Sequence, residues 1–221
     1  MIKKTLLYIA AMYVACLGAS TVVLGETVTV FYDASVEQIK FAVNDVKVAL
    51  ESKAFTVEIA LLSSLSPTSS NKKIVIALAS DKTAATMLEK QGGDKIPANL
   101  GEQAYALRTS KTPQLSYWVL GGDINGAMYG GLQVAENIKF NGFSEIYNSE
   151  ESPDFLQRGA KLNLPLDRRL PTYSGSFGHT SGQLAIPAVW DMAFWREWID
   201  EQARNRYNVL SVWVHHPFLR W

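Results

Sequence analysis

The distribution of apolar and polar residues predicts a regular succession of strands and helices over most of this chain. Residues 27–32 (TVTVFY) alternate as a half-buried strand does, and residues 35–53 carry apolar side chains at helical spacing. Two apolar runs, residues 56–62 and residues 72–79, predict two more strands on either side of a serine-rich loop. The pattern therefore begins as strand, helix, strand, strand.

The same kind of succession continues further along the chain. Residues 81–93 predict a helix that begins at an aspartate N-cap and ends at two glycines. Residues 104–110 and residues 115–122 predict a hairpin, and a glycine-rich turn then opens a helix over residues 124–140. We expect residues 26–150 to form a compact α+β domain, one small sheet backed by helices.

A polar link, YNSEESPD at residues 147–154, predicts a domain boundary near residue 152. Beyond it, AKLNL and NVLSVWV read as strands, and the segment between them has a helical pattern in Trp195, Ile199 and Ala203. Parallel strands need such a helical crossover. We expect residues 151–221 to be the start of a (β/α)8 TIM barrel, of which this sequence holds the first βαβ unit.

The first residues have the layout of an export signal. Two lysines precede an apolar stretch and then small residues, and Val23 and Gly25 favour cleavage before Glu26. Lipid attachment through Cys16 is the alternative, and either outcome places the mature protein in the periplasm or outside the cell. The apolar stretch is interrupted and short for a bilayer span, so we expect no integral membrane span in the mature chain. Residues 1–25 are thus the predicted signal peptide.

Charge and composition exclude several classes of partner. Lysine and arginine number 21 and aspartate and glutamate number 21, so the chain lacks the basic excess typical of nucleic-acid-binding proteins.

The glycines between residues 121 and 131 fit neither the dinucleotide fingerprint nor the Walker motif, and they indicate a tight turn and close packing of a helix on a sheet. A metal pair of His215 and His216 is disfavoured because neighbours on a strand diverge. We expect no cofactor and no metal.

Alternation along the two late strands separates candidate site residues from packing residues. In the first strand Lys161 and Asn163 share one face, which we assign to the barrel interior. In the second strand Trp213 and His215 share the interior face, while the aliphatic face that includes Leu210 should meet the helices. His215 falls at the carboxyl end of its strand, where barrel enzymes place their sites. A histidine that is only hydrogen-bonded in the barrel mouth is the alternative.

Two segments resemble known carbohydrate enzymes. The segment WVLGGDINGAMYGGLQVAENI, residues 118–138, resembles the end of the small non-catalytic domain that precedes the barrel in alpha-glucuronidases and beta-hexosaminidases. QRGAKLNLPLDRRLPTYS, residues 157–174, and the segment of residues 190–218 resemble the opening of the catalytic barrel, closer to the alpha-glucuronidase-like branch. The resemblance runs from about residue 26 to the end of the sequence.

The resemblance implies a glycoside hydrolase that acts on polysaccharide or oligosaccharide, with a pair of catalytic carboxylates on later barrel strands. Those strands lie beyond Trp221, so we expect these residues alone to be catalytically silent. In hexosaminidases an arginine at the opening strand binds sugar hydroxyls, and Arg158 is its positional match, although Asn163 stands where a family aspartate would help hold the strand. A hexosaminidase-like hydrolase and a non-catalytic glycan-binding or interaction module remain the alternatives.

Overall fold

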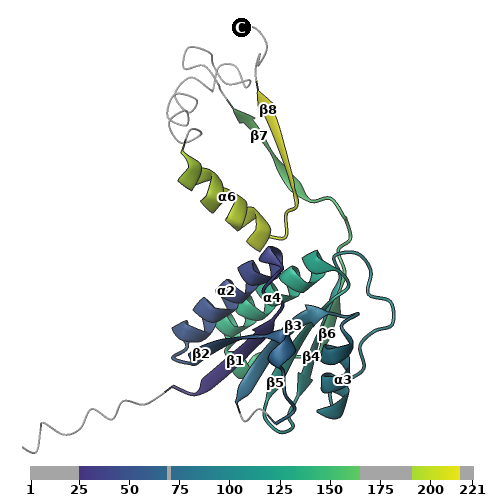
Figure 1. Cartoon of the computed structure of the whole chain (residues 1–221). Coiled ribbons are helices and arrows are strands. Elements are labelled where there is room, and N and C mark those ends of the chain that lie inside the picture. Colours follow the sequence, from purple (N-terminus) through teal and green to yellow (C-terminus); the bar gives the residue numbers. More distant parts are fainter. Residues whose placement is uncertain (1–24, 69–70, 165–190, 215–221) are drawn as a thin grey trace, which may run out of the picture.

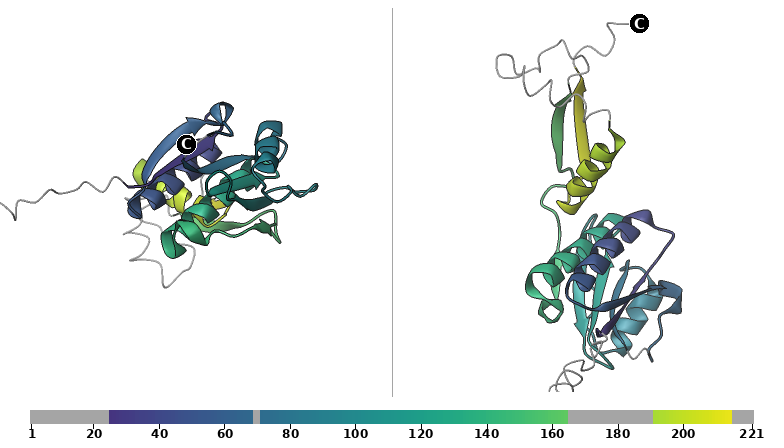
Figure 2. Two further views of the ribbon diagram at one scale, coloured as in Figure 1. Left: turned by 90° about the horizontal axis from the view of Figure 1, so that it is seen from below. Right: turned by 90° about the vertical axis from the view of Figure 1, so that its left-hand side faces the viewer.

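The computed structural model describes residues 25–68, 71–164 and 191–214 (Figure 1). A mixed six-stranded sheet with helices on both faces makes up the larger part of it, which we call the sheet domain. A parallel strand pair with one helix extends from the sheet domain as a separate arm (Figure 2). The predicted export signal, including Cys16, lies outside the described residues apart from Gly25.

The six strands of the sheet domain lie in the order β2-β1-β3-β5-β4-β6. Strands β1, β2, β3 and β5 run parallel, and β4 runs antiparallel to β5 and β6, so the predicted hairpin is confirmed. The bounds are β1 Thr27–Tyr32, β2 Thr56–Leu61, β3 Lys72–Leu78, β4 Tyr105–Ser110, β5 Ser116–Gly121 and β6 Ser149–Glu151. One-turn helices η1 (Leu62–Ser64) and η2 (Phe143–Glu145) follow β2 and α4.

Strand β6 falls inside the segment predicted as a polar link. Its three residues, Ser149–Glu151, pair with β4 at the edge of the sheet. A strand this short and polar shows no apolar alternation, which explains why the sequence pattern indicates a linker there. The domain boundary near residue 152 stays a prediction.

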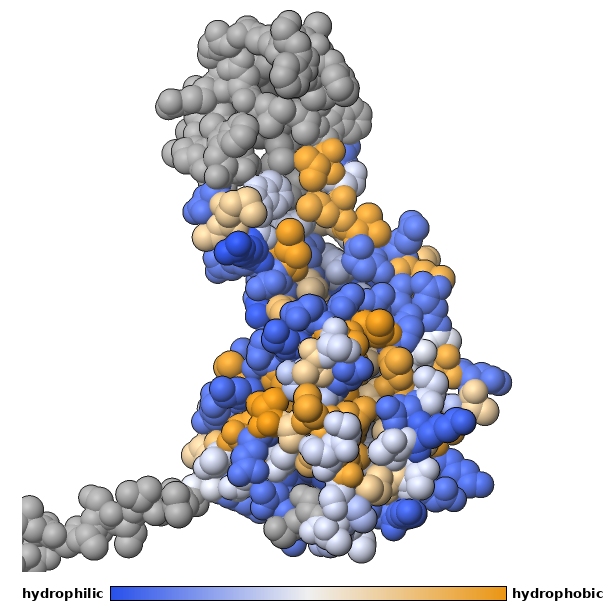
Figure 3. Space-filling view, in the orientation of Figure 1, coloured by the Kyte–Doolittle hydropathy of each residue, from blue (hydrophilic) through white to orange (hydrophobic). Residues whose placement is uncertain are grey.

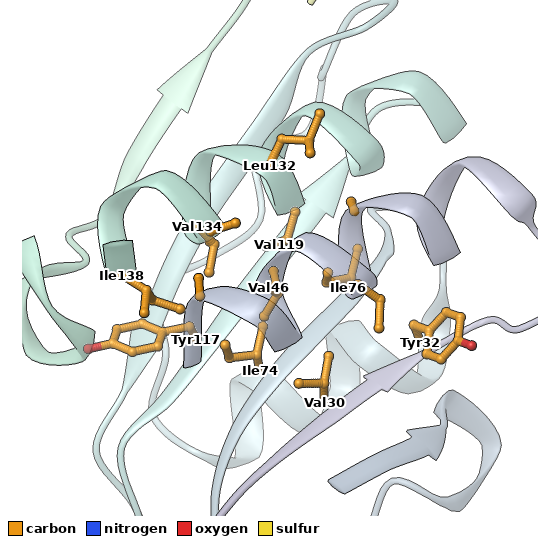
Figure 4. Packing of buried hydrophobic residues seen from close by; sticks show 14 of the residues in the cluster. Val30, Tyr32, Val46, Ile74, Ile76, Tyr117, Val119, Leu132, Val134 and Ile138 are labelled. Atoms are coloured by element: carbon orange, nitrogen blue, oxygen red, sulfur yellow. The ribbon is translucent and has the colours of Figure 1, made fainter. Parts of the chain in front are cut away.

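Helices cover both faces of the sheet. Helices α2 (Glu37–Ser52) and α4 (Ile124–Asn141) pack side by side on one face, and α3 (Lys82–Lys90) lies on the other (Figure 1). The core under α2 and α4 is built from aliphatic residues of strands and helices (Figure 4), among them Val30, Val46, Ile74, Ile76, Val119, Leu132 and Ile138. The predicted α+β domain with helix-backed sheet is therefore confirmed.

The glycine-rich turn brings α4 close to the sheet. The carboxylate of Asp123 caps α4 by accepting a hydrogen bond from the backbone N–H of Gly126 at 2.7 Å. A Cβ atom at Gly126 would lie 2.0 Å from the carbonyl oxygen of Ala104, and one at Gly130 would lie 2.5 Å from a methyl group of Val119. The predicted role of these glycines, a tight turn and close helix packing, is confirmed.

The arm contains the predicted strand, helix and strand. Strands β7 (Gly159–Leu164) and β8 (Val209–Val214) pair in parallel, and α6 (Met192–Arg204) connects them in sequence. Asp191 caps α6 through the backbone N–H of Ala193 at 2.8 Å, as the sequence indicates. The βαβ unit is confirmed as such, and its membership of a barrel stays a prediction.

The aliphatic face of β8 is not covered by the helix, contrary to expectation. On that face Leu210 and Val212 are 40% and 43% exposed, Val209 on the other face is 41% exposed, and no residue of α6 is buried. Apolar surface is visible on the arm in Figure 3. A single helix beside two strands provides too little surface to bury them. Within the described residues, no helix has the length and apolar character needed to cross a membrane.

Candidate functional site

The parallel register of the arm makes two of the predicted sugar-contacting residues, Asn163 and Trp213, backbone partners across its two strands. Lys161 of β7 lies opposite Ser211 of β8, and both are exposed. One step further along, the backbones of Asn163 and Trp213 are register partners. His215 lies outside the described residues. The role of these residues in sugar binding stays a prediction.

Arg158 immediately precedes β7, and its half-buried guanidinium is surrounded by protein acceptors. Its Nε donates to the backbone carbonyl of Arg206 at 2.9 Å, and one terminal nitrogen donates to the carbonyl of Phe155. The other terminal nitrogen donates to Oε1 of Gln103 at 2.9 Å. Its carbon also lies 5.4 Å from the ring centre of Tyr129. These contacts join the start of β7 to the sheet domain.

Gln103 and Asn208 complete this network. Asn208 donates to Oε1 of Gln103 at 3.0 Å and accepts from the backbone N–H of Arg158 at 2.9 Å. Both amide side chains also donate to the carbonyl of Leu156, at 2.9 Å from Gln103 and 2.8 Å from Asn208. The backbone N–H of Gln103 is in turn held by Asp123, the cap of α4, at 3.0 Å. The helix cap and the first strand of the arm are therefore linked through one buried glutamine.

Two more arginines fasten the end of α6 to the helices of the sheet domain. Arg206 donates to both carboxylate oxygens of Glu136 in α4 at 3.0 Å each. Arg204 donates to both oxygens of Asp45 in α2 at 2.7 and 3.2 Å. Bidentate pairing of this kind fixes geometry as well as adding energy. We call Arg158, Arg204 and Arg206, with their acceptors on the sheet domain, the arginine latch.

Two of the three latch arginines pair with carboxylates of the sheet domain, Arg204 with Asp45 and Arg206 with Glu136. The hydrogen bonds that Arg204 donates to the carboxylate of Asp45 raise the pKa of Arg204, which stays protonated at any accessible pH. Burial raises the pKa of Tyr129, and the nearby Arg158 partly opposes that shift. Burial likewise raises the pKa of Tyr105 to about 12, with Arg206 acting in the opposite direction. Arg204 stays charged and the two tyrosines stay neutral near neutral pH, so these contacts do not change with pH in that range.

Two latch residues have backbones in the left-handed region, with φ of 59° at Gln103 and 60° at Arg206. A residue with a side chain loses about 1 kcal/mol there relative to glycine. At Arg206 the helix ends in a Schellman motif, in which the N–H of Tyr207 reaches the carbonyl of Gln202 at 2.8 Å and the N–H of Arg206 reaches Ala203 at 2.9 Å. That position favours glycine, so an arginine there indicates that its side chain is needed. The φ angle of Arg206 is known only from the structure, so the sequence alone gives no signal for the latch.

Comparison with known proteins finds a solved structure with a similar fold. No protein-family model matches the chain, and no curated protein matches it. Among solved structures, a GH138 enzyme targeting pectin rhamnogalacturonan II matches with a TM-score of 0.57 and 22% sequence identity. The match covers 87% of this chain and 24% of that one. The chain has a glycoside-hydrolase-like fold.

A second glycoside hydrolase structure, CpGH84D, has a TM-score of 0.47 and 14% identity over 62% of this chain and 22% of that one. The chain spans only 24% of the GH138 enzyme, so the similarity concerns one portion of that enzyme. The described residues of this chain contain no group of three or more histidine, cysteine, aspartate or glutamate side chains arranged to hold a metal ion.

Proposed function

We propose that this chain is the front portion of an exported glycoside hydrolase, most similar to alpha-glucuronidases, that acts on the glycosidic bonds of oligosaccharides or polysaccharides. The observation that carries the proposal is the match of this chain to a GH138 enzyme over 87% of its length, and the parallel β7–β8 pair with its intervening helix, which contacts the mixed-sheet domain, supports it. The sheet domain acts as an accessory domain, and the arm provides the first two strands of a (β/α)8 barrel.

The exposure of the arm supports its assignment to a barrel. An isolated two-stranded sheet has two open edges and cannot bury its own faces. Val209, Leu210 and Val212 are each at least 40% exposed, and the helix α6 has no buried residue. Further strands and helices of a barrel would cover both the strands and the helix. The described part of the arm thus has apolar surface of the kind that a barrel buries.

The candidate residues have different roles in this proposal. Lys161, Asn163, Trp213 and His215 would contact sugar from the interior face near the carboxyl ends of their strands, where barrels bind substrate. Arg158 lies before the amino end of β7 and its guanidinium is bonded to Gln103 and to two backbone carbonyls. For Arg158 we propose that it positions the strand, rather than binding sugar directly. The acid and base belong to later strands.

The deciding experiment begins with the gene. Sequencing the transcript or locus past the codon for Trp221 should reveal an open reading frame with further β/α units and acidic residues at strand ends. The protein from that complete frame should hydrolyse glucuronosyl substrates, whereas the 221 residues alone should hydrolyse none. Release of N-acetylhexosamine instead would favour the hexosaminidase alternative. A stop codon directly after Trp221, or a complete protein inactive on every glycoside tested, would overturn the proposal.

A further inference from the structure

A cavity of about 440 Å³ opens at the carboxyl ends of β1, β2 and β3, well removed in sequence from the arm. It is lined by the last residues of β1 and β2, by the segments that follow them and by the beginning of α3, including Tyr32, Asp33, Ser35, Leu61, Asp81 and Thr83. Ligand pockets of proteins range from about 300 to 1,000 Å³, so this volume suits one or two sugar rings. None of these residues belongs to the arginine latch.

The cavity lies where the chain changes direction across the sheet. After β1 the chain continues into α2 on one face, and after the neighbouring β3 it continues into α3 on the opposite face. The two connections therefore diverge, which leaves a crevice between the loops that contain Asp33 and Asp81. In open α/β sheets, ligands bind in such a crevice outside the carboxyl ends of the strands. The location of the cavity is thus one that the topology itself produces.

The lining combines hydrogen-bonding groups with apolar surface. Asp33 Oδ1 accepts from the backbone N–H of Ser35 at 2.9 Å and from its hydroxyl at 2.7 Å, and Asp81 Oδ1 accepts from the N–H of Ala84 at 2.9 Å. In each carboxylate, Oδ1 therefore accepts hydrogen bonds that fix its position. Oδ2 of each accepts no hydrogen bond from the described residues. Leu61 lines the cavity and is 55% exposed, and its register partner Tyr32, which also lines the cavity, is 8% exposed.

This chemistry selects among ligand classes. Two carboxylates on one cavity repel phosphate, sulfate and acidic sugars. Among the described residues there is no set of three ligands that would hold a metal ion. A neutral sugar matches both features, because its hydroxyls donate to carboxylates and its C–H face packs on apolar side chains.

We propose that this cavity binds a neutral sugar unit, so that the sheet domain contacts carbohydrate at a second place besides the barrel. Asp33 and Asp81 would accept hydrogen bonds from sugar hydroxyls, and Leu61 and Tyr32 would contact the apolar face of the ring. The inference goes beyond the proposed function, because it concerns binding by the sheet domain and holds whether or not the complete enzyme is a hydrolase.

The test is saturation-transfer difference NMR on the full 221-residue chain, with D-galactose, D-glucose and L-rhamnose as neutral probes. D-galacturonic acid serves as the anionic probe and putrescine as the cationic one. We expect transfer to at least one neutral sugar and none to galacturonic acid. Asp33→Ala should weaken the neutral-sugar signal about tenfold or more, because a charge-assisted hydrogen bond is lost. Leu61→Asn, a change at an exposed side chain, should weaken it with the fold intact.

The matched control is Glu89→Ala, which removes the same charge from an exposed position near the other end of α3 and should leave binding unchanged. Thermal melting of each variant checks that the fold is retained. The proposal is overturned if no neutral sugar shows transfer, if putrescine binds instead, or if folded Asp33→Ala and Leu61→Asn bind sugar as the unaltered chain does. Because no hydrolysis is measured, failure here leaves the proposed function unaffected.

Discussion

Lys73 is an unusual residue to find inside a sheet. It lies in β3 between Thr29 of β1 and Ser116 of β5, and its exposure is 1%. Its ammonium nitrogen has no hydrogen-bond partner among the described residues, and burial lowers its pKa. A buried charge without a partner is destabilising, so this residue lowers the stability of the sheet domain.

We therefore expect Lys73→Met to stabilise the protein by about 1 kcal/mol or more in urea unfolding. Because the folded-state pKa is below that of the unfolded chain, the penalty is full below the folded pKa and fades as pH rises through it. The advantage of methionine should accordingly shrink at alkaline pH. Lys72→Met is the control, since Lys72 pairs with Glu26 at the surface at 2.7 Å and its loss should cost little. A destabilised Lys73→Met protein would show that the ammonium has a partner.

Arg206 gives a second prediction at this scale. Replacing it with lysine keeps the charge but removes the two-pronged contact with Glu136, and no compensating relief of backbone strain follows because lysine also has a Cβ. Amide hydrogen exchange in α6 and β8 should accelerate about tenfold, which corresponds to the loss of one charge-assisted hydrogen bond. Exchange in β1 and β3 should not change.

Arg196→Lys is the matched control for Arg206→Lys, because Arg196 is an exposed residue of the same helix. It should leave exchange rates as they are. Equal exchange in all three proteins would mean that the contact with Glu136 does not hold the arm.

At the level of elements, α4 depends on the absence of side chains where it meets the sheet. Alanine in place of Gly126 would put a methyl group 2.0 Å from the carbonyl oxygen of Ala104, and a backbone atom of a buried strand end cannot move aside cheaply. The helix propensity gained by alanine, about 1 kcal/mol, is smaller than the cost of this overlap.

Gly126→Ala should therefore destabilise the protein by about 2 kcal/mol or more in chemical denaturation, in spite of its better helix propensity. Gly101→Ala provides the comparison, because a Cβ there would have nothing within 4 Å, and its effect should be within about 0.5 kcal/mol of zero. Similar small effects for both variants would contradict the close packing of α4.

The elements also show what could be predicted from the sequence. Strands such as β1 and β3 and helices such as α2 and α4 follow from local apolar periodicity, which is written in consecutive residues. Strand β6 has no such periodicity and exists only because β4 offers it an edge. The prediction that the aliphatic face of β8 packs against helices was wrong for the described residues. The pattern of one strand gives no information on how much surface its neighbours supply.

The arginine latch could not be predicted from the sequence pattern for a related reason. Gln103 and Asn208 are 105 residues apart, and Asp45 and Arg204 are 159 apart. No local rule connects residues at such separations, and the resemblance to hexosaminidases drew attention to Arg158 only as a sugar ligand. The left-handed backbone of Arg206 at the end of α6 is likewise visible only in the structure.

At the scale of the whole molecule, the sheet domain and the arm differ in how completely they are buried. The sheet domain has cores on both faces of its sheet, whereas β8 exposes Val209, Leu210 and Val212. A pair of apolar strands with open edges is a template for association with other chains. The solubility and the melting behaviour of the 221-residue chain should therefore depend mainly on the arm.

We expect residues 26–150 alone to be more soluble, and to melt more cooperatively, than residues 26–221. Sedimentation after stepwise concentration and calorimetry would compare the two proteins at equal ionic strength. The protein expressed from the complete open reading frame should again be soluble, because further barrel strands would cover the arm. Equal solubility and equally cooperative melting of both proteins would count against the barrel assignment.

The separation of the latch partners in sequence also sets an order in time. A ribosome releases the chain from its amino terminus, so Asp45, Gln103 and Glu136 emerge before Arg204 and Arg206 exist as part of the chain. Domains generally fold as units during synthesis, with the amino-terminal one first. The sheet domain can thus be complete, with its acceptors in place, when the later arginines arrive. It would then serve as an internal template that receives the first barrel strands as they are made.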